Sequence, residues 1–273
     1  MTGEESGGPD VPDLPERPAE AASATPEPPR AGRGVGGSGG DAGSGADGET
    51  PVHAVGIGPG NPELLTRRAG RLLREADVVV GFGTVVDYVA DETDADLIAC
   101  GYRDEPEALG RFAARVEDGA RGVAVLMGDP NHSGYQFLGK VESAVDAPVE
   151  AVPGISSVQM AASRARTPLE DSTFVTLHVR GDVSADLTRT SRDAGDRHLI
   201  VIPRPYDWMP EDVAARLLAD GADPALDALV LERMTHPDER VTRTDLGSLA
   251  ADAGGDGAED TAFSDLSVLV VRA

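Results

Sequence analysis

Apolar positions follow two alternating patterns along the chain from residue 52 onward. Short apolar runs, typical of buried strands, are separated by stretches with apolar residues at i, i+3, i+4 and i+7, typical of amphipathic helices. In the first half the strand-like runs lie at 53–57, 77–80, 97–100, 123–127 and 149–152. Strands that alternate with helices predict a parallel sheet with right-handed crossovers, covered by helices on both faces.

Helix start and stop signals agree with this pattern. Asn61 is placed to cap a helix that has Pro62 at its first position, and Pro106 opens another helix that ends near Gly119. A third helix is expected over 135–145. The fourth opens at Ser156, which has capping-box spacing with Gln159.

A second unit is expected after the Thr167-Pro168 break. Its helix begins at Pro210, and its strand-like runs lie at 173–178, 199–202, 228–232, 240–244 and 267–272. Two of these runs are too close for a helix between them, so the sheet should be mixed. The sequence therefore predicts two α/β domains, 51–168 with a parallel sheet and 169–273 with a mixed sheet, a size usual for domains.

Residues 1–50 differ in composition from the rest of the chain. They hold 12 Gly and 7 Pro, and ten acidic residues stand against three Arg. Such a segment buries too little apolar surface to offset its ordering entropy, so we expect a disordered acidic tail.

The net charge of the chain limits which classes of partner it can bind. The 24 Lys and Arg against 48 Asp and Glu give a net charge of −24, which argues against general binding to nucleic acid or to an anionic membrane. Lys140 is the only lysine in the chain. We interpret this composition as halophilic, because molar salt screens the self-repulsion of an acidic surface; an acidic protein of low-salt origin is the alternative.

Cysteine and histidine give no support for a disulfide or a metal site. Cys100 is the only cysteine, and the five histidines are scattered singly. No apolar run is long enough to span a bilayer, and the acidic N-terminus lacks the apolar core of a signal peptide. We expect a cytoplasmic protein without a metal.

Three glycine- or serine-containing motifs follow predicted strands. The first, 56–61, reads Gly-Ile-Gly-Pro-Gly-Asn. It lacks the third glycine of a dinucleotide fingerprint and the Lys-Ser/Thr of a P-loop. Two interpretations remain: a tight loop that lets the backbone approach a ligand before a capped helix, or a turn without a ligand. The second is Gly128-Asp129-Pro130, which suits a ligand with a ribose or an amino group but is also a common turn. The third, 152–157, opens the helix at Ser156 with N–H groups and hydroxyls. Ligands of such folds bind at the carboxyl ends of strands and between domains.

The order and spacing of these motifs resemble the tetrapyrrole methylase family, whose members methylate corrin and sirohaem precursors. The resemblance extends over essentially everything after the tail, and the stretch 236–241, His-Pro-Asp-Glu-Arg-Val, is similar to the branch that methylates C5 of cobalt-precorrin-7. It implies S-adenosylmethionine as methyl donor, folded in a cleft between two domains. By this resemblance the cofactor contacts are Gly128, Asp129, Pro130, Ile155, Ser156 and Ser157, and the substrate contacts are Gly58, Pro59, Gly60 and Arg180.

The chemistry makes modest demands on side chains. A sulfonium methyl is already activated, so holding an electron-rich ring carbon in line within about 3 to 3.5 Å supplies much of the catalysis. Asp129, His132 and His178 are candidate proton acceptors, although a lone histidine is more often structural. Several arginines are candidates for the substrate carboxylates: Arg103, Arg164, Arg166, Arg180 and Arg204.

The sequence thus predicts an S-adenosylmethionine-dependent methyltransferase that acts on C5 of cobalt-precorrin-7 in anaerobic cobalamin synthesis. Another precorrin carbon, a protein acceptor as in diphthine synthase, and a non-catalytic binding module are the alternatives. We expect a homodimer without nucleic-acid or membrane partners. Decarboxylation needs an electron sink that the chain does not evidently provide, so it is left to a separate C15-methyltransferase.

Overall fold

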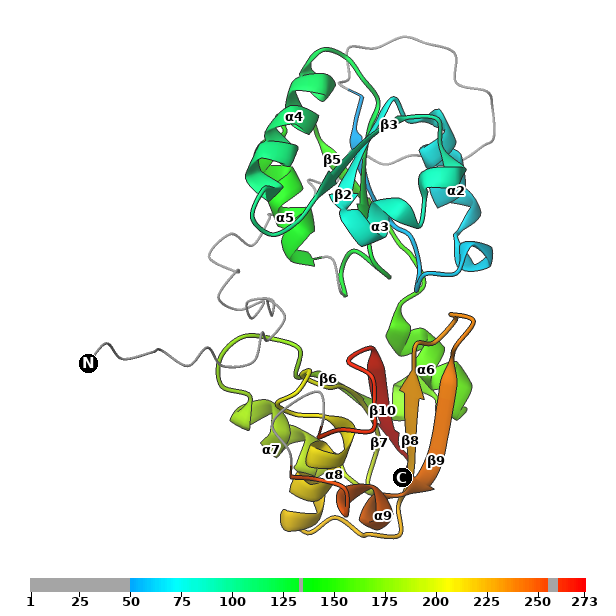
Figure 1. The fold of residues 1–273 in the computed structure, drawn as a ribbon, viewed down its shortest axis with the longest axis vertical. Helices are drawn as coiled ribbons and strands as arrows, with labels where there is room; N and C mark the ends of the chain where they lie inside the picture. Colours follow the sequence, from blue (N-terminus) through cyan, green and yellow to red (C-terminus); the bar gives the residue numbers. More distant parts are fainter. Residues whose placement is uncertain (1–49, 133–134, 255–259) are drawn as a thin grey trace, which may run out of the picture. The chain divides into compact units, whose positions relative to one another are not determined.

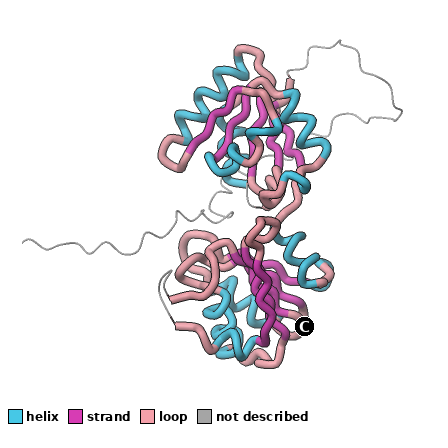
Figure 2. The backbone as a smooth tube through the Cα atoms, turned by 45° about the vertical axis from the view of Figure 1, so that its right-hand side comes forward, coloured by secondary structure: helices cyan, strands magenta, loops and turns pink. Residues whose placement is uncertain are grey.

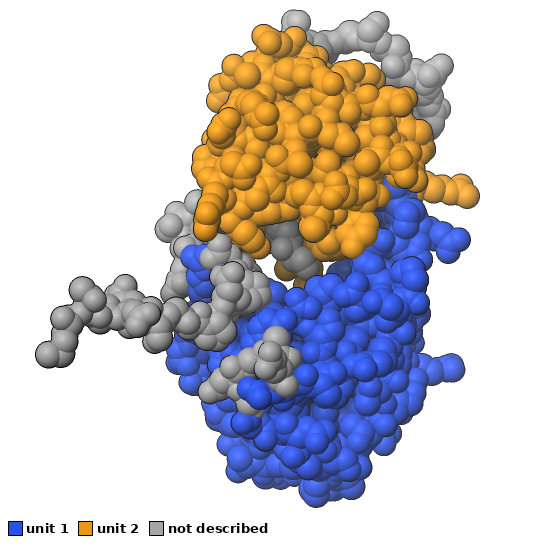
Figure 3. Space-filling view, in the orientation of Figure 1, with its two compact units in different colours: residues 1–17, 57–66, 154–273 blue, residues 18–56, 67–153 orange. Residues whose placement is uncertain are grey.

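The computed structural model describes residues 50–132, 135–254 and 260–273, which form two compact units (Figure 3). The parallel-sheet unit comprises 50–56 and Arg67–Pro153, and the mixed-sheet unit comprises Ile57–Thr66 and the described part of Gly154–Ala273. The predicted tail lies outside the described residues apart from Thr50. Its disorder stays a prediction.

The parallel-sheet unit contains five strands in the order β3-β2-β4-β1-β5, every neighbouring pair parallel (Figure 1). The strands are β1 (Val52–Gly56), β2 (Val78–Phe82), β3 (Asp96–Cys100), β4 (Gly122–Leu126) and β5 (Val149–Val152). The helices are α2 (Arg67–Glu75), α3 (Gly83–Asp87), α4 (Glu105–Glu117) and α5 (Tyr135–Ala144), with a 3-10 turn η3 (Ala90–Glu92).

Successive strand residues face opposite sides of this sheet, and the inner strands β2, β4 and β1 are buried on both sides. One face packs on α4 and α5, where Phe112 is fully buried beside Phe137 and Val141. On α2, Ala69 and Leu73 are fully buried, and the helix contacts β1. Burial on both faces explains why these inner strands read as largely apolar runs, and the parallel pairing confirms the predicted α/β architecture.

The mixed-sheet unit also has five strands, in the order β6-β7-β10-β8-β9. They are β6 (Ser172–Thr176), β7 (His198–Ile202), β8 (Asp227–Glu232), β9 (Arg240–Asp245) and β10 (Ser267–Val271). Only β6 and β7 are parallel neighbours, so the predicted mixed sheet is confirmed. The helices are α6 (Ser157–Ala165), α7 (Ser184–Asp193), α8 (Pro210–Ala219) and α9 (Leu246–Ala250), and the 3-10 turns are η2 (Pro62–Leu64) and η4 (Leu169–Asp171).

Helices lie on both sides of the mixed sheet (Figure 2). One face packs against α7, α8 and α9 through Leu187, Leu217 and Leu249. The opposite face packs against α6, whose Val158 and Ala161 meet strand residues of β7, β8 and β10. The sequence prediction assigned this helix to the first domain, but its apolar stripe contacts the second sheet. The domain boundary at residue 168 stays a prediction. In the structure, the chain passes from one compact unit to the other between Pro153 and Gly154.

The predicted helix start at Asn61 also differs from the structure. Asn61 Oδ1 accepts a hydrogen bond from the Glu63 backbone N–H at 2.9 Å, so the cap is present, but it caps η2. Leu65 then takes an extended conformation with ψ 126°, and α2 begins only at Arg67. The first half of the predicted helix is therefore a separate turn.

Candidate active site

Three adjacent strands of the parallel sheet end in register. β4 and β5 flank β1, with Gly56 beside Leu126 and Val55 beside Val152. Because all three strands are parallel, their carboxyl ends lie at one edge of the sheet. The motifs predicted from the sequence begin directly after these strands, so the fold brings the starts of all three together.

The motif after β4 forms a tight turn. Gly128 is buried and has φ 65°, a left-handed conformation that favours glycine. Asp129 Oδ1 accepts a hydrogen bond from the Asn131 N–H at 2.9 Å, and the Asp129 carbonyl accepts one from the His132 N–H at 3.0 Å. The half-buried carboxylate therefore stabilises the turn, while buried Pro130 fixes its backbone.

The motif after β5 ends in the capping box predicted from the sequence. Ser156 Oγ accepts from the Gln159 N–H at 3.3 Å, and Gln159 Oε1 accepts from the Ser156 N–H at 2.8 Å. Ser156 is buried, whereas Ile155 and Ser157 are half-buried. The Ser156 hydroxyl thus serves the helix end, and Ile155 and Ser157 keep part of their surface accessible to a ligand.

The loop after β1 is shaped by two glycines. Gly58 is buried with φ 82°, and Gly60 has φ 108°. A Cβ at Gly58 would lie 3.3 Å from the Leu64 carbonyl oxygen, so the loop approaches its own following turn closely. The Pro59 carbonyl oxygen accepts a hydrogen bond from Thr235 Oγ1 at 3.3 Å, a residue of the β8–β9 turn in the same unit.

One end of the mixed sheet carries unusual backbone conformations. The strands end or begin there at Ile202, Glu232, Arg240 and Ser267. In the described part of the chain four residues other than glycine have positive φ, and three of them follow these ends: Tyr206 at 61°, Arg233 at 47° and Thr235 at 73°. Such conformations cost on the order of 1–3 kcal/mol each and cluster at functional sites.

Arg204 ties the loops at this end together. Its guanidinium donates to the carbonyl oxygens of Leu177 at 3.1 Å and Gly181 at 2.8 Å, and it pairs with Asp207 at 2.9 Å. The side chain is 11% exposed. The structure therefore gives Arg204 a structural role in place of the substrate contact considered from the sequence.

The other candidate arginines differ in their surroundings. Arg164 donates two hydrogen bonds to the Glu239 carboxylate, at 2.6 and 3.1 Å, and Arg166 ends α6 with φ 57°. Arg103, Arg166 and Arg180 are exposed. Their side chains are therefore accessible to a substrate.

Both histidines considered as proton acceptors are half-buried. Burial lowers the pKa of His132, against the opposing effect of the Asp129 carboxylate. Burial also lowers the pKa of His178, where Asp265 opposes the shift and Arg204 adds to it. Both imidazoles are therefore biased toward the neutral form, which can accept a proton at neutral pH.

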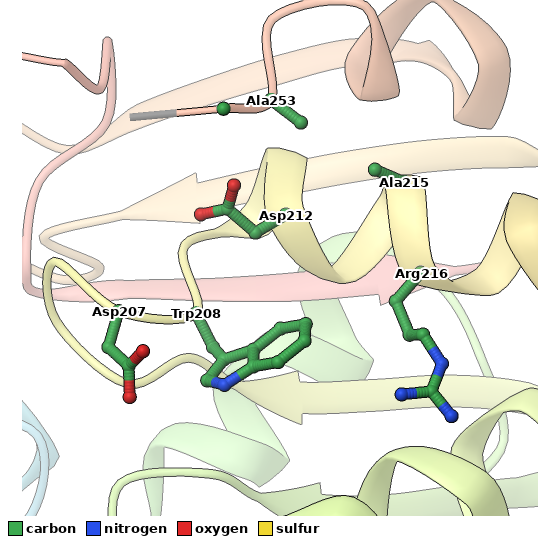
Figure 4. Close-up of a pocket in the computed structure, with 7 residues that line it drawn as sticks. Asp207, Trp208, Asp212, Ala215, Arg216 and Ala253 are labelled. Atoms are coloured by element: carbon green, nitrogen blue, oxygen red, sulfur yellow. The ribbon is translucent and has the colours of Figure 1, made fainter. Parts of the chain in front are cut away.

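A shallow depression on the mixed-sheet unit lies beside Trp208 (Figure 4). Its charged side chains already have partners, since Asp207 pairs with Arg204, Asp212 accepts from the Met209 N–H at 3.0 Å and Arg216 pairs with Asp220 at 2.7 Å. None of the residues predicted to bind a ligand lines it. The strand-end motifs are the better candidates.

The described residues hold no cluster of three or more His, Cys, Asp or Glu side chains arranged to bind a metal ion. Among the same residues, no helix combines the length and the apolar character that a membrane span requires.

Comparison with known proteins decides the family. The family model for Tetrapyrrole (Corrin/Porphyrin) Methylases matches residues 51–250, well over half of the chain. The chain belongs to this family. It is thus a methyltransferase of the S-adenosylmethionine-dependent kind, and its fold is the one that the sequence resemblance implied.

Two curated relatives illustrate the range of family members. The probable cobalt-precorrin-7 C(5)-methyltransferase of Methanocaldococcus jannaschii is 30% identical over 224 residues, which cover 80% of this chain and 96% of that protein. The siroheme synthase of Gluconobacter oxydans is 31% identical over 222 residues, covering 74% of this chain. The methylase spans about half of that synthase, 46% of its length.

Solved structures agree with the fold. A cobalt-precorrin-4 methyltransferase has a TM-score of 0.65 at 21% identity, covering 82% of this chain and 95% of that one. Uroporphyrin-III C-methyltransferase from Thermus thermophilus, complexed with S-adenosylhomocysteine, has a TM-score of 0.61 at 25% identity, covering 81% and 97%.

Sequence reasoning missed Thr235 and Glu239 as site-supporting residues. The stretch 236–241 served only to choose a branch of the family, and nothing local in it signals that residue 235 has positive φ. The available signal was that this stretch links two strands by a tight connection, where strained residues are common.

Proposed function

We propose that this methylase transfers a methyl group from S-adenosylmethionine to C5 of cobalt-precorrin-7. The observation that carries the proposal is the relative from Methanocaldococcus jannaschii, a probable C5-methyltransferase matched over 96% of its length. The 236–241 stretch, on which the C5 branch was inferred, supports the same choice.

The residues at the strand ends fit the cofactor. Gly128 has no side chain at a buried position with φ 65°, so a ligand can approach the backbone there. We also assign Asp129, Pro130, Ile155, Ser156 and Ser157 to cofactor binding, with Ser156 acting mainly through the helix end that it caps. The cofactor supplies a sulfonium methyl that is already activated toward an electron-rich carbon.

Substrate binding is assigned to the loop of Gly58, Pro59 and Gly60 and to Arg180. Arg180 is exposed on a protein of net charge −24, so its guanidinium supplies a local positive charge for a substrate carboxylate. His132 and His178, both biased toward the neutral form, are the candidate acceptors for the proton released from the ring carbon. Catalysis then rests on positioning the two reacting atoms more than on a strong base.

The decisive experiment offers labelled S-adenosylmethionine with cobalt-precorrin-7 in high salt. We expect the mass of one methyl to be added without loss of carbon dioxide, because decarboxylation is assigned to a separate C15-methyltransferase. Parallel incubations with uroporphyrinogen III, with other precorrins and with the protein acceptor of diphthine synthesis test the alternatives. Transfer only to one of those acceptors refutes the C5 assignment, and transfer to none favours a non-catalytic module. Sedimentation of the same preparation tests the proposed homodimer.

A pair of glycine variants tests the cofactor site. Gly128→Ala and Gly119→Ala both place a Cβ on a residue of positive φ, 65° and 92°, so both should lose about 1 kcal/mol of stability. Gly119 follows Asp118, the C-cap of α4, and has nothing within 4 Å of a Cβ. Titration calorimetry should show at least about tenfold weaker S-adenosylhomocysteine binding for Gly128→Ala alone, a loss of about 1.4 kcal/mol. Equal affinities for the two variants would exclude Gly128 from the cofactor site.

A further inference from the structure

The Glu239 carboxylate connects two of the motifs assigned to ligand binding. It accepts hydrogen bonds from Arg164 Nε at 2.6 Å and Arg164 Nη2 at 3.1 Å, and a third from the Thr235 N–H at 2.7 Å. Arg164 lies on α6, the helix that begins at the Ser156-Ser157 motif. Thr235 Oγ1 in turn donates to the Pro59 carbonyl in the substrate loop. A single carboxylate therefore connects this helix to the loop.

The turn that Glu239 holds is strained. Thr235 is β-branched and has φ 73°, and Arg233 two residues earlier has φ 47°. A β-branched residue in this region is a genuine outlier and persists only where surrounding contacts impose it. Glu239 is the contact at the Thr235 backbone, and Arg233 is restrained separately by its ion pair with Asp238 at 2.5 Å.

The carboxylate is well suited to this task. Its side chain is 19% exposed, so the hydrogen bonds from Arg164 are partly protected from water. These hydrogen bonds are the main reason that the pKa of Glu239 lies below its usual value, with the Thr235 N–H contributing in the same direction. Glu239 therefore stays ionised in neutral solution and keeps all three bonds.

We infer that Glu239, fixed by Arg164, is a positioning residue that holds Thr235 against Pro59 and so sets the geometry of the Gly58–Gly60 loop for the acceptor substrate. The inference rests on the proposed function for the loop's role. Without Glu239, Thr235 relaxes toward ordinary φ values and its hydroxyl leaves the Pro59 carbonyl. The loop then keeps its own turn but loses its external support.

The chain offers a closely matched control. Asp77 in the parallel-sheet unit likewise accepts two guanidinium hydrogen bonds, from Arg121 Nε and Nη2 at 2.9 Å each, and one backbone N–H, from Arg121, at 2.9 Å. It lies at the amino-terminal side of β2, away from the strand ends that carry the motifs. Glu239→Ala and Asp77→Ala therefore remove the same kind of interaction at two different places.

The first test needs no substrate. Hydrogen exchange of the Ile57–Thr66 amides in the full chain should be about tenfold faster in Glu239→Ala than in the wild type and unchanged in Asp77→Ala. Unchanged exchange in Glu239→Ala overturns the inference, whatever the protein methylates. Faster exchange in an enzyme that fails to methylate cobalt-precorrin-7 supports the inference and refutes only the proposed acceptor.

The second test separates positioning from stability. Thr235→Gly removes the hydroxyl but also removes the strain, so its unfolding midpoint should not fall, while kcat/KM for the acceptor falls about tenfold because a misplaced reactant is costly. Thr235→Ser keeps the hydroxyl and should retain kcat/KM within about twofold. A Thr235→Gly enzyme with full activity, or a loss of activity that only follows a loss of stability, overturns the inference.

Discussion

The chain's single lysine forms an ion pair with a buried carboxylate. Glu105 is the first residue of α4, and its side chain is 4% exposed, whereas that of Lys140 on α5 is 54% exposed. Lys140 Nζ lies 2.8 Å from Glu105 Oε1 and 2.9 Å from Oε2. We predict that Lys140→Met destabilises the parallel-sheet unit, because it leaves a buried carboxylate without its counter-ion.

The size of the loss follows from three contributions. Breaking a fully buried pair costs about 3–5 kcal/mol, whereas an exposed pair contributes only about 0.2–1 kcal/mol. Lys140 is half-exposed, which places this pair between the two limits. The α4 N-terminus offsets about 0.3–1 kcal/mol by stabilising the remaining negative charge. We expect a loss of about 2 kcal/mol, equivalent to a melting temperature lower by about 4–8 °C in a chain of this size.

A double-mutant cycle measured by denaturant unfolding in constant high salt tests this value. Glu105→Gln should cost less than Lys140→Met, because an unpaired Lys140 ammonium can reach water while an unpaired Glu105 carboxylate cannot. The double variant should resemble Glu105→Gln, with a coupling energy above about 1 kcal/mol. Arg115→Met is the control, since its pair with Asp96 is exposed on both sides, and it should cost less than about 1 kcal/mol. Additive losses, or equal losses for Lys140→Met and Arg115→Met, would refute the reasoning.

Three further predictions concern pH, reactivity and salt. Burial raises the pKa of Glu211, so its contribution to stability is present below the pKa of the unfolded carboxyl and is lost as pH rises through the higher folded value. Glu211→Gln should therefore raise the melting temperature at pH 7 more than at pH 4.5. The same change at the exposed Glu107, Glu107→Gln, should not. Burial raises the pKa of the Cys100 thiol to about 11, so a disulfide reagent at pH 8 should label it only after denaturation, and rapid labelling of the native protein would contradict the buried position. The net charge of −24 predicts loss of structure as salt falls from about 1 M to 0.01 M, where the Debye length grows from about 3 to 30 Å; an unfolding midpoint indifferent to salt would remove the halophilic interpretation.

The fold could be predicted from the sequence wherever one physical signal dominated. Strands buried on both faces have largely apolar runs, so β1 and β4 were located within one residue of their bounds. The capping box at Ser156 was also predictable, because its side-chain and backbone bonds depend on spacing alone. The sequence prediction did not include the short helices α3 and α9, whose five residues are too few for a periodic pattern to show.

The site was predictable only as a set of strand ends. A parallel sheet requires that motifs following its strands begin at one edge, so the common edge at the carboxyl ends of β1, β4 and β5 followed from topology. The contacts of the candidate arginines could not be predicted in this way. Arg204 donates to a carbonyl 27 residues away along the chain, and Arg164 donates to a carboxylate 75 residues away. Their structural roles depend on long-range packing that no local pattern encodes.

The assignment of Ile57–Thr66 to the mixed-sheet unit has a consequence for biosynthesis. The hydrogen bond between Thr235 and Pro59 joins residues 176 positions apart. At about 5–20 residues per second, a ribosome needs on the order of ten seconds or more to add the second partner after the first. The nascent parallel sheet can form during that interval, while its glycine loop waits for a partner that has not been translated. The Gly58–Gly60 loop therefore acquires its support among the last events of folding, and a prematurely terminated chain folds in part while lacking this support.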